Sequence, residues 1–244
     1  MLLVFSAHAA DFCSRAGGAI ALYARRGVPV HVVDLTLGER GESEDYWAGA
    51  GERSIERAKE TRAAEARQAA GMLGASIEFL NYGDYPLLCG RERIDALARI
   101  IRRHRPEILL THWKTDPFNV DHQETAAAVL RAATMAAVPG FDHPEGAHPF
   151  PHAFGFEPTI PRNDVTGFVP DTYVDIGEVF ETKMAALAKL RSQTKLVRLY
   201  TQWAEYRGAQ ASQWRGRPVR YAEAYQRFTA WVGAQFPLPA SEDR

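Results

Sequence analysis

The stretch LLVFSAHAAD, residues 2–11, decides the fold class of this chain. Its first half, Leu2 to Ser6, is short and continuously apolar, as expected of a strand buried on both faces of a parallel sheet. Residues 13–26 (CSRAGGAIALYARR) then predict a helix, and Gly27 is placed to end it. A buried strand that leads at once into a helix predicts a βαβ unit, with residues 7–11 as the loop at the carboxyl end of the first strand.

The alternation of strand and helix patterns continues along most of the chain. Further strands are predicted at residues 30–35, 76–80, 107–111 and 152–156. Further helices are predicted at residues 54–73, 91–105, 123–137, 177–193, 195–211 and 221–236. This order predicts an α/β protein with a mostly parallel sheet and helices on both faces. We expect one domain over residues 1–244, with a polar tail at about residues 237–244.

The composition excludes several classes of function. With 29 basic and 30 acidic residues, the formal net charge is −1, which gives no bulk attraction to nucleic acid or to an anionic membrane. No apolar run approaches the roughly 20 residues that span a bilayer, and the apolar start lacks the basic residues of a signal peptide. Cys13 and Cys89 form neither a CxxC pair nor a disulfide framework. We therefore expect a cytoplasmic protein whose partners are not nucleic acids or membranes.

Three polar segments follow predicted strands. They are SAHAAD at residues 6–11, GERGES at 38–43 and DPFNVDH at 116–122. In open α/β sheets, ligands bind in the crevice beyond the carboxyl ends of the strands. These segments are therefore the candidates for a functional site.

A metal site is the first interpretation of two of these segments. His8 and Asp11 are three residues apart at a strand end, and His122 begins a helix beside the same crevice. Two imidazoles and a carboxylate make an open Zn²⁺ site with a fourth position for water or substrate. Asp121 is placed to orient a metal ligand or a reacting group without binding the metal itself. The alternative is that Asp11 only caps the helix that follows it.

The combined motifs resemble the PIG-L/LmbE superfamily of zinc-dependent deacetylases. The similarity runs from residue 2 to about residue 225 and includes RxxExxxAxxxLG at residues 62–74 and YAEAY at 221–225. It implies a Rossmann-like fold and the zinc ligands His8, Asp11 and His122. Two catalytic positions of that family differ here. The general base of its AHPDD motif is Ala10, and Asn119 replaces a histidine credited with stabilising the oxyanion. Amide hydrolysis needs both functions.

One branch of that superfamily, the 4-oxalomesaconate hydratases of the aromatic-acid (gallate) 4,5-cleavage pathway, is similar in SAHAADFCSRAGGAIAL, GERGES, GDYP and DPFNVDH. This resemblance implies a hydro-lyase that adds water to the C=C bond of an unsaturated polycarboxylate. It implies Glu42 as the general base, whereas the loop alone leaves open Glu39 as the working carboxylate, or a role of both in capping and solvating the loop. The branch's second catalytic group is a histidine after Glu-Pro, where this chain has Thr159, so the substrate and the proton donor stay open. The rival function is N-deacetylation of an amino sugar or similar amide.

A polycarboxylate substrate requires cationic groups, and planar guanidinium groups suit carboxylates best. Arg15 and Arg40 are the candidates, with solvated surface arginines as the alternative. Asp121 and Asn119 join Glu42 as candidate catalytic residues.

Several other side chains leave alternatives open. His112 can face the site or be a buried, hydrogen-bonded histidine. His143, His148 and His152 lie in a Pro-rich loop that favours a lid or an oligomer contact, and the last two are alternative proton donors. Asp84 in GDYP is more typical of a turn. We expect a homo-oligomer.

Overall fold

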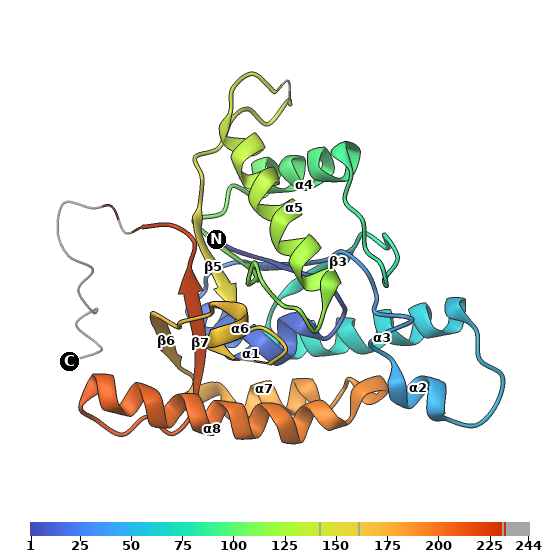
Figure 1. Cartoon of the computed structure of the whole chain (residues 1–244), viewed down its shortest axis with the longest axis vertical. Coiled ribbons are helices and arrows are strands. Elements are labelled where there is room, and N and C mark those ends of the chain that lie inside the picture. The colour runs from blue at the N-terminus through green and yellow to red at the C-terminus, as the bar shows by residue number, and fades with distance from the viewer. Residues whose placement is uncertain (142, 161, 231, 233–244) are drawn as a thin grey trace.

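The computed structural model describes residues 1–141, 143–160, 162–230 and 232, and it confirms the α/β class (Figure 1). The described strands form one sheet in the order β3-β2-β1-β4-β5-β7-β6. Their bounds are β1 Leu2–Ser6, β2 Val30–Asp34, β3 Ser76–Phe79, β4 Ile108–His112, β5 His152–Phe156, β6 Thr172–Asp175 and β7 Ala222–Arg227. β1 to β5 pair in parallel, whereas β7 is antiparallel to both β5 and β6. The sheet is therefore mostly parallel, as predicted.

Helices cover both faces of the sheet (Figure 1). One face carries α1 (Asp11–Arg25), α3 (Ile55–Leu73), α7 (Phe180–Leu187) and α8 (Lys195–Arg215). The other face carries α4 (Arg91–His104) and α5 (Val120–Ala137). Short helical segments are α2 (Glu44–Ala48), α6 (Asn163–Thr166), η1 (Gly177–Val179) and η2 (Arg191–Gln193). In the described part of the chain, no helix has the length and apolar character to cross a membrane.

The side chains of β1 show how the apolar run builds both cores. Leu2 and Val4 pack into the cluster under α1 and α3, while Leu3 and Phe5 pack into the cluster under α4 and α5. A strand with both faces covered needs apolar residues at every position, because successive side chains point to opposite faces.

Close packing explains the glycines of α1. A Cβ atom on Gly18 would lie 2.4 Å from Ile176 Cγ2. The carboxylate of Glu223 on β7 accepts hydrogen bonds from the backbone N–H groups of Gly18 (2.7 Å) and Ala19 (2.8 Å), and it pairs with Lys183 Nζ at 2.7 Å. Helix α1 is thereby anchored to the C-terminal part of the sheet.

Two predictions about the last third of the chain are wrong. The helix predicted at residues 221–236 is instead the strand β7 at Ala222–Arg227, and the sequence patterns do not predict β6. The helix predicted at residues 177–193 is divided into η1, α7 and η2. Pairing of β7 with strands on both sides outweighs the helix propensity of its alanines and glutamate. The predicted tail at residues 237–244 lies outside the described residues.

Candidate metal centre and active site

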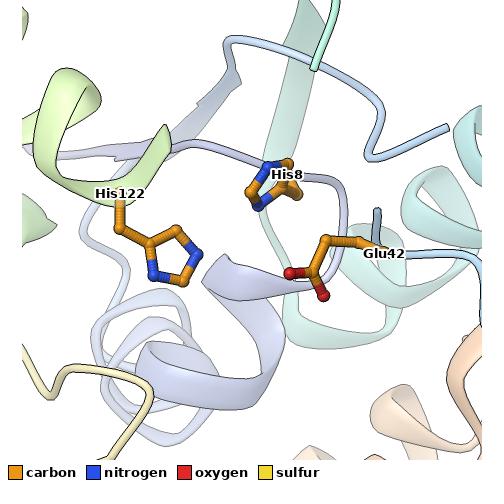
Figure 2. Close-up of side chains that lie close together, drawn as sticks. All are labelled: His8, Glu42 and His122. Atoms are coloured by element: carbon orange, nitrogen blue, oxygen red, sulfur yellow. The ribbon is translucent and has the colours of Figure 1, made fainter. Parts of the chain in front are cut away.

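Three of the predicted residues meet at the carboxyl end of the sheet. His8 lies in the loop after β1, Glu42 in the loop after β2, and His122 in the first turn of α5. Figure 2 shows their side chains pointing toward one another. Potential ligand atoms of these three residues lie within 4.8 Å of one another, and so do those of Asp11, His112 and His122.

Asp11 lies at the centre of this group. Its Oδ2 atom is 3.2 Å from His8 Nδ1 and 3.4 Å from His122 Nε2. Helix α1 begins at Asp11 with Ala10 at the N-cap position, and no side chain caps it. The capping alternative for Asp11 therefore does not describe this structure.

The two histidines present free nitrogens toward Asp11. His8 Nδ1 and His122 Nε2 are buried without a hydrogen-bond partner. Their other ring nitrogens are held by carboxylates, since His8 Nε2 is 3.2 Å from Asp121 Oδ2 and His122 Nδ1 is 2.9 Å from Asp116 Oδ2. A carboxylate behind each imidazole is typical of metal-bound histidines. The residues present therefore fit a divalent metal ion.

The electrostatics of the centre favour a positive charge. Burial lowers the pKa of His8, but the carboxylates of Asp11 and Asp121 outweigh it and raise this pKa to about 10. Burial likewise raises the pKa of Asp11, but His122 and His112 hold it well below its ordinary value. An ionised, buried carboxylate between imidazoles stabilises a cation, whether that is a proton or a metal ion.

His112 supports His122. Its Nε2 atom accepts a hydrogen bond from the backbone N–H of Ala7 at 3.0 Å, and its ring stacks on His122 with centroids 3.9 Å apart. Burial, reinforced by His122, lowers the pKa of His112 to about 3, so the imidazole is neutral. The structure combines the two alternatives for this residue, because His112 is a buried, hydrogen-bonded histidine whose Nε2 atom also faces the site, 3.4 Å from Asp11 Oδ2.

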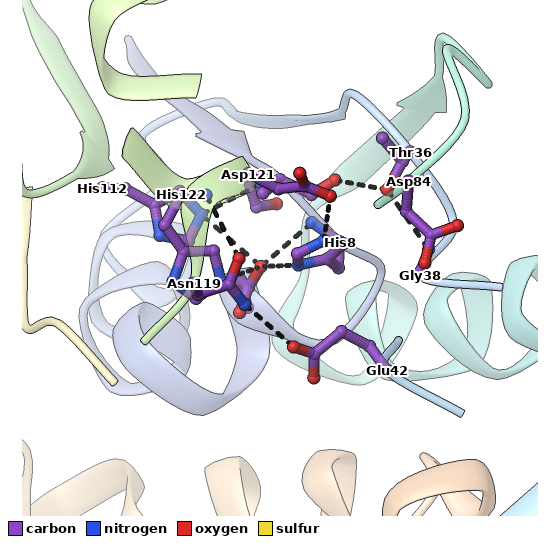
Figure 3. Close-up of polar contacts among 12 residues, drawn as sticks. His8, Thr36, Gly38, Glu42, Asp84, His112, Asn119, Asp121 and His122 are labelled. Carbon is purple, nitrogen blue, oxygen red and sulfur yellow. Dashed lines mark hydrogen bonds and ion pairs between the residues drawn. The ribbon is translucent and has the colours of Figure 1, made fainter. Parts of the chain in front are cut away.

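Glu42 is held by donors from three segments. Its Oε1 atom accepts hydrogen bonds from Asn119 Nδ2 at 2.9 Å and Tyr85 Oη at 3.2 Å. Its Oε2 atom accepts from Gln193 Nε2 at 2.6 Å. Figure 3 shows the contact with Asn119 beside the histidines. Glu39 is 1% exposed and lies 3.4 Å from Lys59 Nζ, which leaves Glu42 as the carboxylate of this loop that faces the histidines.

Both carboxylate oxygens of Asp121 accept hydrogen bonds on the side of His8 that faces away from Asp11. It is 0% exposed, and its oxygens accept hydrogen bonds from the backbone N–H groups of Tyr85 and Leu87, both at 2.9 Å, in addition to the contact with His8. Asp121 therefore joins the turn at residues 84–87 to the metal centre.

Asn119 has two functions in the structure. Its Oδ1 atom caps helix α5 by accepting from the N–H of His122 at 3.3 Å. Its amide nitrogen donates to Glu42. This cap starts α5 at Val120, three residues earlier than predicted, and orients His122.

The two predicted arginines differ in their surroundings. Arg15 is 7% exposed, and its nitrogens donate to Asp11 Oδ1 (3.3 Å), the carbonyl of Glu157 and Thr159 Oγ1 (3.4 Å). Arg40 is exposed, with Nε 4.0 Å from Asp84 Oδ1. Asp84 also accepts from the N–H groups of Arg40 and Gly41, so it shapes this loop.

Thr159 lies behind His122. Its backbone N–H and hydroxyl group donate to Asp116 Oδ2 at 2.7 and 2.8 Å, and its hydroxyl oxygen is 3.4 Å from His122 Nδ1. Thr159 thus braces the carboxylate that orients His122.

The three histidines of the Pro-rich loop lie away from this centre. His152 begins β5, whose far end adjoins His112, and His148 Nε2 contacts the carbonyl of Pro106 at 2.9 Å. His143 Nε2 lies 2.8 Å from Asp95 Oδ1. The structure therefore removes His148 and His152 as proton donors.

Three side chains at the site are not predicted by the sequence patterns. Tyr85 stacks on His8 with ring centroids 5.7 Å apart, and Gln193 reaches Glu42 from η2. Arg62 is 0% exposed and donates through Nε to the carbonyl of Leu37. Arg62 is the first residue of the RxxE motif and Tyr85 lies in GDYP, but neither motif alone assigns these side chains a role.

The guanidinium group of Arg62 is partly unsatisfied. Nη1 and Nη2 have no hydrogen-bond partner, and Nη1 lies 3.8 Å from Glu65 Oε2. Nη2 is 3.4 Å from where a Cβ on Gly38 would lie, and that position is 2.8 Å from Glu42 Cβ and 3.1 Å from His8 Cβ. A buried cation with free donors thus adjoins the loop that carries Glu42.

The family model described as "PIG-L: GlcNAc-PI de-N-acetylase" matches residues 3–133, which is more than half of the chain. This chain belongs to the PIG-L family. The resemblance inferred from the SAHAAD and DPFNVDH motifs is thereby confirmed. Among its relatives, 4-oxalmesaconate hydratase of Pseudomonas putida is 41% identical over 228 residues, which cover 92% of this chain and 87% of the relative. A probable N-acetyl-alpha-D-glucosaminyl L-malate deacetylase of Bacillus cereus is 30% identical and covers 80% of this chain and 84% of the relative.

Solved structures agree with this assignment to the PIG-L family. The crystal structure of 4-carboxy-2-hydroxymuconate hydratase from Pseudomonas putida superposes with a TM-score of 0.91 at 39% identity, covering 96% of this chain and 98% of that one. N,N'-diacetylchitobiose deacetylase from Pyrococcus horikoshii superposes with a TM-score of 0.77 at 23% identity, covering 93% and 83%, which shows the fold alone.

Proposed function

We propose that this PIG-L family member is a zinc-dependent hydratase that adds water to the C=C bond of 4-oxalomesaconate, an unsaturated tricarboxylate of aromatic-acid (gallate) catabolism. The observation that carries the proposal is Glu42, held by three donors beside the free nitrogens of His8 and His122. The hydratase relatives support it along nearly the whole chain. Ala10 has no carboxylate to act as the base of a deacetylase, which disfavours the rival function.

The proposed ligands of zinc are His8, Asp11 and His122. A zinc ion held there would supply Lewis acidity toward a carbonyl or carboxylate oxygen of the substrate. In this proposal Asp121 positions His8, while Asp116 and Thr159 position His122.

Glu42 is the proposed general base. Its carboxylate takes one proton from a water molecule, and the oxygen of that water forms the new C–O bond with one carbon of the C=C bond. The π electrons of the C=C bond move toward the other carbon. We assign the return of that proton to the same carboxyl group, so that water is added without other reagents. The hydroxyl group of Tyr85 also contacts Glu42. Burial and the charge of Glu42 raise the pKa of Tyr85, so its hydroxyl acts as a hydrogen-bond donor.

The proposed carboxylate-binding groups are Arg40 and Arg62. Nη1 and Nη2 of Arg62 have no hydrogen-bond partner, and a bound carboxylate would accept from both. Arg40 is exposed beside the same loop. Arg15, predicted as a substrate ligand, has all three nitrogens engaged, so we propose that it positions Asp11 instead.

The decisive experiment follows the ultraviolet absorbance of the conjugated tricarboxylate with purified, zinc-loaded protein. Loss of the chromophore is expected, and acetate release from an N-acetylated amino sugar without such loss would establish the rival function. Glu42→Gln should reduce kcat by about 100-fold or more, as loss of a general base does, with zinc content unchanged. Glu39→Gln is the matched control from the same loop, and it should retain activity. His122→Ala should lose the zinc of this site.

The partner proposals follow from the same chemistry. The proposed partner is a small carboxylate molecule, and we propose a cytoplasmic location and a homo-oligomeric state. Light scattering after size exclusion measures the mass, and a mass of one chain would contradict the oligomer.

A further inference from the structure

We infer that His31, Glu78 and His104 form a second metal site, separate from the centre at His8. Potential ligand atoms of these three residues lie within 4.8 Å of one another. They come from β2, β3 and the last turn of α4. Two imidazoles and a carboxylate are a ligand set for Zn²⁺ and similar borderline divalent ions, and not for Mg²⁺ or Ca²⁺, which prefer oxygen ligands.

The sheet register brings the first two ligands to one face. His31 pairs with Ser76 and Val33 pairs with Glu78 in the parallel ladder between β2 and β3. Residues two apart on a strand share a face, so these four side chains lie on the side that α4 covers, where Val33 packs into the core cluster. The group is partly shielded, because the side chains of His31 and Glu78 are 13% and 33% exposed.

Hydrogen-bonding neighbours orient the ring of His31. When the hydroxyl of Ser76 donates to the carbonyl of Val30 at 3.2 Å, its oxygen accepts from His31 Nδ1, which lies 2.7 Å away. A neutral His31 then carries its proton on Nδ1 and its lone pair on Nε2. This Nε2 atom lies 3.2 Å from Glu78 Oε1, which is also an acceptor. In this tautomer the two acceptors face each other, and a metal ion between them satisfies both, in place of the proton that joins them in the metal-free chain.

His104 completes the set from the end of α4. Its ring stacks on that of His31 with centroids 4.4 Å apart and planes 17° apart. The C-terminus of a helix carries partial negative charge, which favours a cation there. Arg103 Nη2 lies 3.2 Å from Glu78 Oε1, but its side chain is 54% exposed and can leave when a metal ion binds. Small rotations of His104 and Glu78 are needed to reach tetrahedral zinc with bonds of about 2.0–2.2 Å.

The location indicates a structural role. β3 is at the edge of the sheet, and His31 and Ser76 lie at or near the start of β2 and β3, at the end of the strands opposite the loops that carry His8 and Glu42. A metal ion bound by His31, Glu78 and His104 would join the edge strand to α4.

The test measures zinc binding by tag-free, metal-free protein, using calorimetry and elemental analysis after gel filtration. We expect two equivalents per wild-type chain, one in His122→Ala, one in His104→Gln and none in the double variant. His31→Gln and Glu78→Gln should weaken the second equivalent by about 10-fold or more. His152→Gln, a change at an exposed histidine outside the group, should retain two.

Thermal unfolding supplies a second readout. Zinc should raise the Tm of His122→Ala, because only this second site remains, and it should leave the Tm of the double variant unchanged. The inference is overturned if His122→Ala binds no zinc, or if His104→Gln binds as much zinc as wild-type protein. It is independent of catalysis, because hydratase activity can fail while the second equivalent still binds.

Discussion

Gln193 is the clearest example of a single residue whose contact assigns it a role. Its Nε2 atom is the donor to Glu42 Oε2, while its Oε1 atom is buried without a partner. We predict that Gln193→Ala lowers kcat by about 10-fold with zinc content and KM nearly unchanged, because the base loses a charge-assisted hydrogen bond worth about 1.5–3 kcal/mol. Steady-state kinetics test this. Thr194→Ala is the neighbouring control, and equal activity of the Gln193 variant and wild type would refute the positioning role.

Tyr85 distinguishes two sources for the proton that goes to carbon. If Glu42 returns the proton, Tyr85→Phe removes one of two donors to Oε1, and Asn119 remains. We then predict a loss in kcat of less than about 10-fold, the effect of one hydrogen bond. The measurement is the kcat of Tyr85→Phe, compared with the kcat of Glu42→Gln under the same conditions. A loss as large as that of Glu42→Gln would instead identify the phenol as the acid.

Residue types at strand ends are sufficient to predict that His8, Asp11 and His122 lie together. The role of Glu42 comes from family resemblance, because its loop alone does not separate it from Glu39. Gln193 escapes sequence reasoning because it lies 151 residues from Glu42 in an otherwise ordinary helical pattern. No spacing rule links such distant positions, since only the completed fold places η2 over the loop after β2.

At the level of elements, the parallel strands are predictable from the sequence and β7 is not. β1 to β5 are short runs between helices, and the predicted bounds of β5, residues 152–156, match the structure. In β7 the sequence AEAYQR contains residues that favour helices, and Glu223 is a charged residue at a buried position. Its partners Lys183 and the N–H groups of α1 are visible only in the tertiary structure.

Helix α1 offers a test of this anchoring. Gly18→Ala introduces a Cβ within 2.4 Å of Ile176, so we predict a decrease of about 1–3 kcal/mol or more in the free energy of unfolding. Gly71→Ala is the matched control on α3, where no atom lies within 4 Å of the new Cβ. That change should stabilise the protein by roughly 0.5–1 kcal/mol. Urea unfolding measures both, and a neutral Gly18→Ala would contradict the close packing.

For the whole molecule, the site depends on both halves of the chain. Residues 3–133, which match the family model, contain His8, Glu42 and His122, whereas Thr159 and Gln193 lie outside that range. The N-terminal part therefore holds the proposed metal and base, and the C-terminal part braces them through Asp116 and Glu42. Sequence patterns predict the layered fold because layers follow from local periodicity. They do not predict the contacts of Thr159 and Gln193 with the site, because these contacts depend on long-range packing.

The buried histidine beneath the site makes the stability of the whole protein depend on pH. Burial lowers the pKa of His112 to about 3, whereas an unfolded histidine titrates near 6.5. Between these values the unfolded chain binds a proton that the folded chain does not, so the free energy of unfolding falls as pH decreases from 6.5 toward 3. The slope from one such group is at most about 1.4 kcal/mol per pH unit.

His112→Gln should remove this component, since a glutamine side chain can still accept from the N–H of Ala7. We predict that the stabilities of wild type and His112→Gln, measured by urea unfolding in EDTA, converge below pH 6.5 and run parallel above it. His8 does not interfere, because its pKa is raised to about 10 and its contribution is complete below pH 6.5 and declines between 6.5 and 10. Parallel curves between pH 4.5 and 6.5 would contradict this prediction. They would mean that His112 takes up a proton in the folded protein as readily as in the unfolded chain, so that the imidazole stacked on His122 is not held neutral.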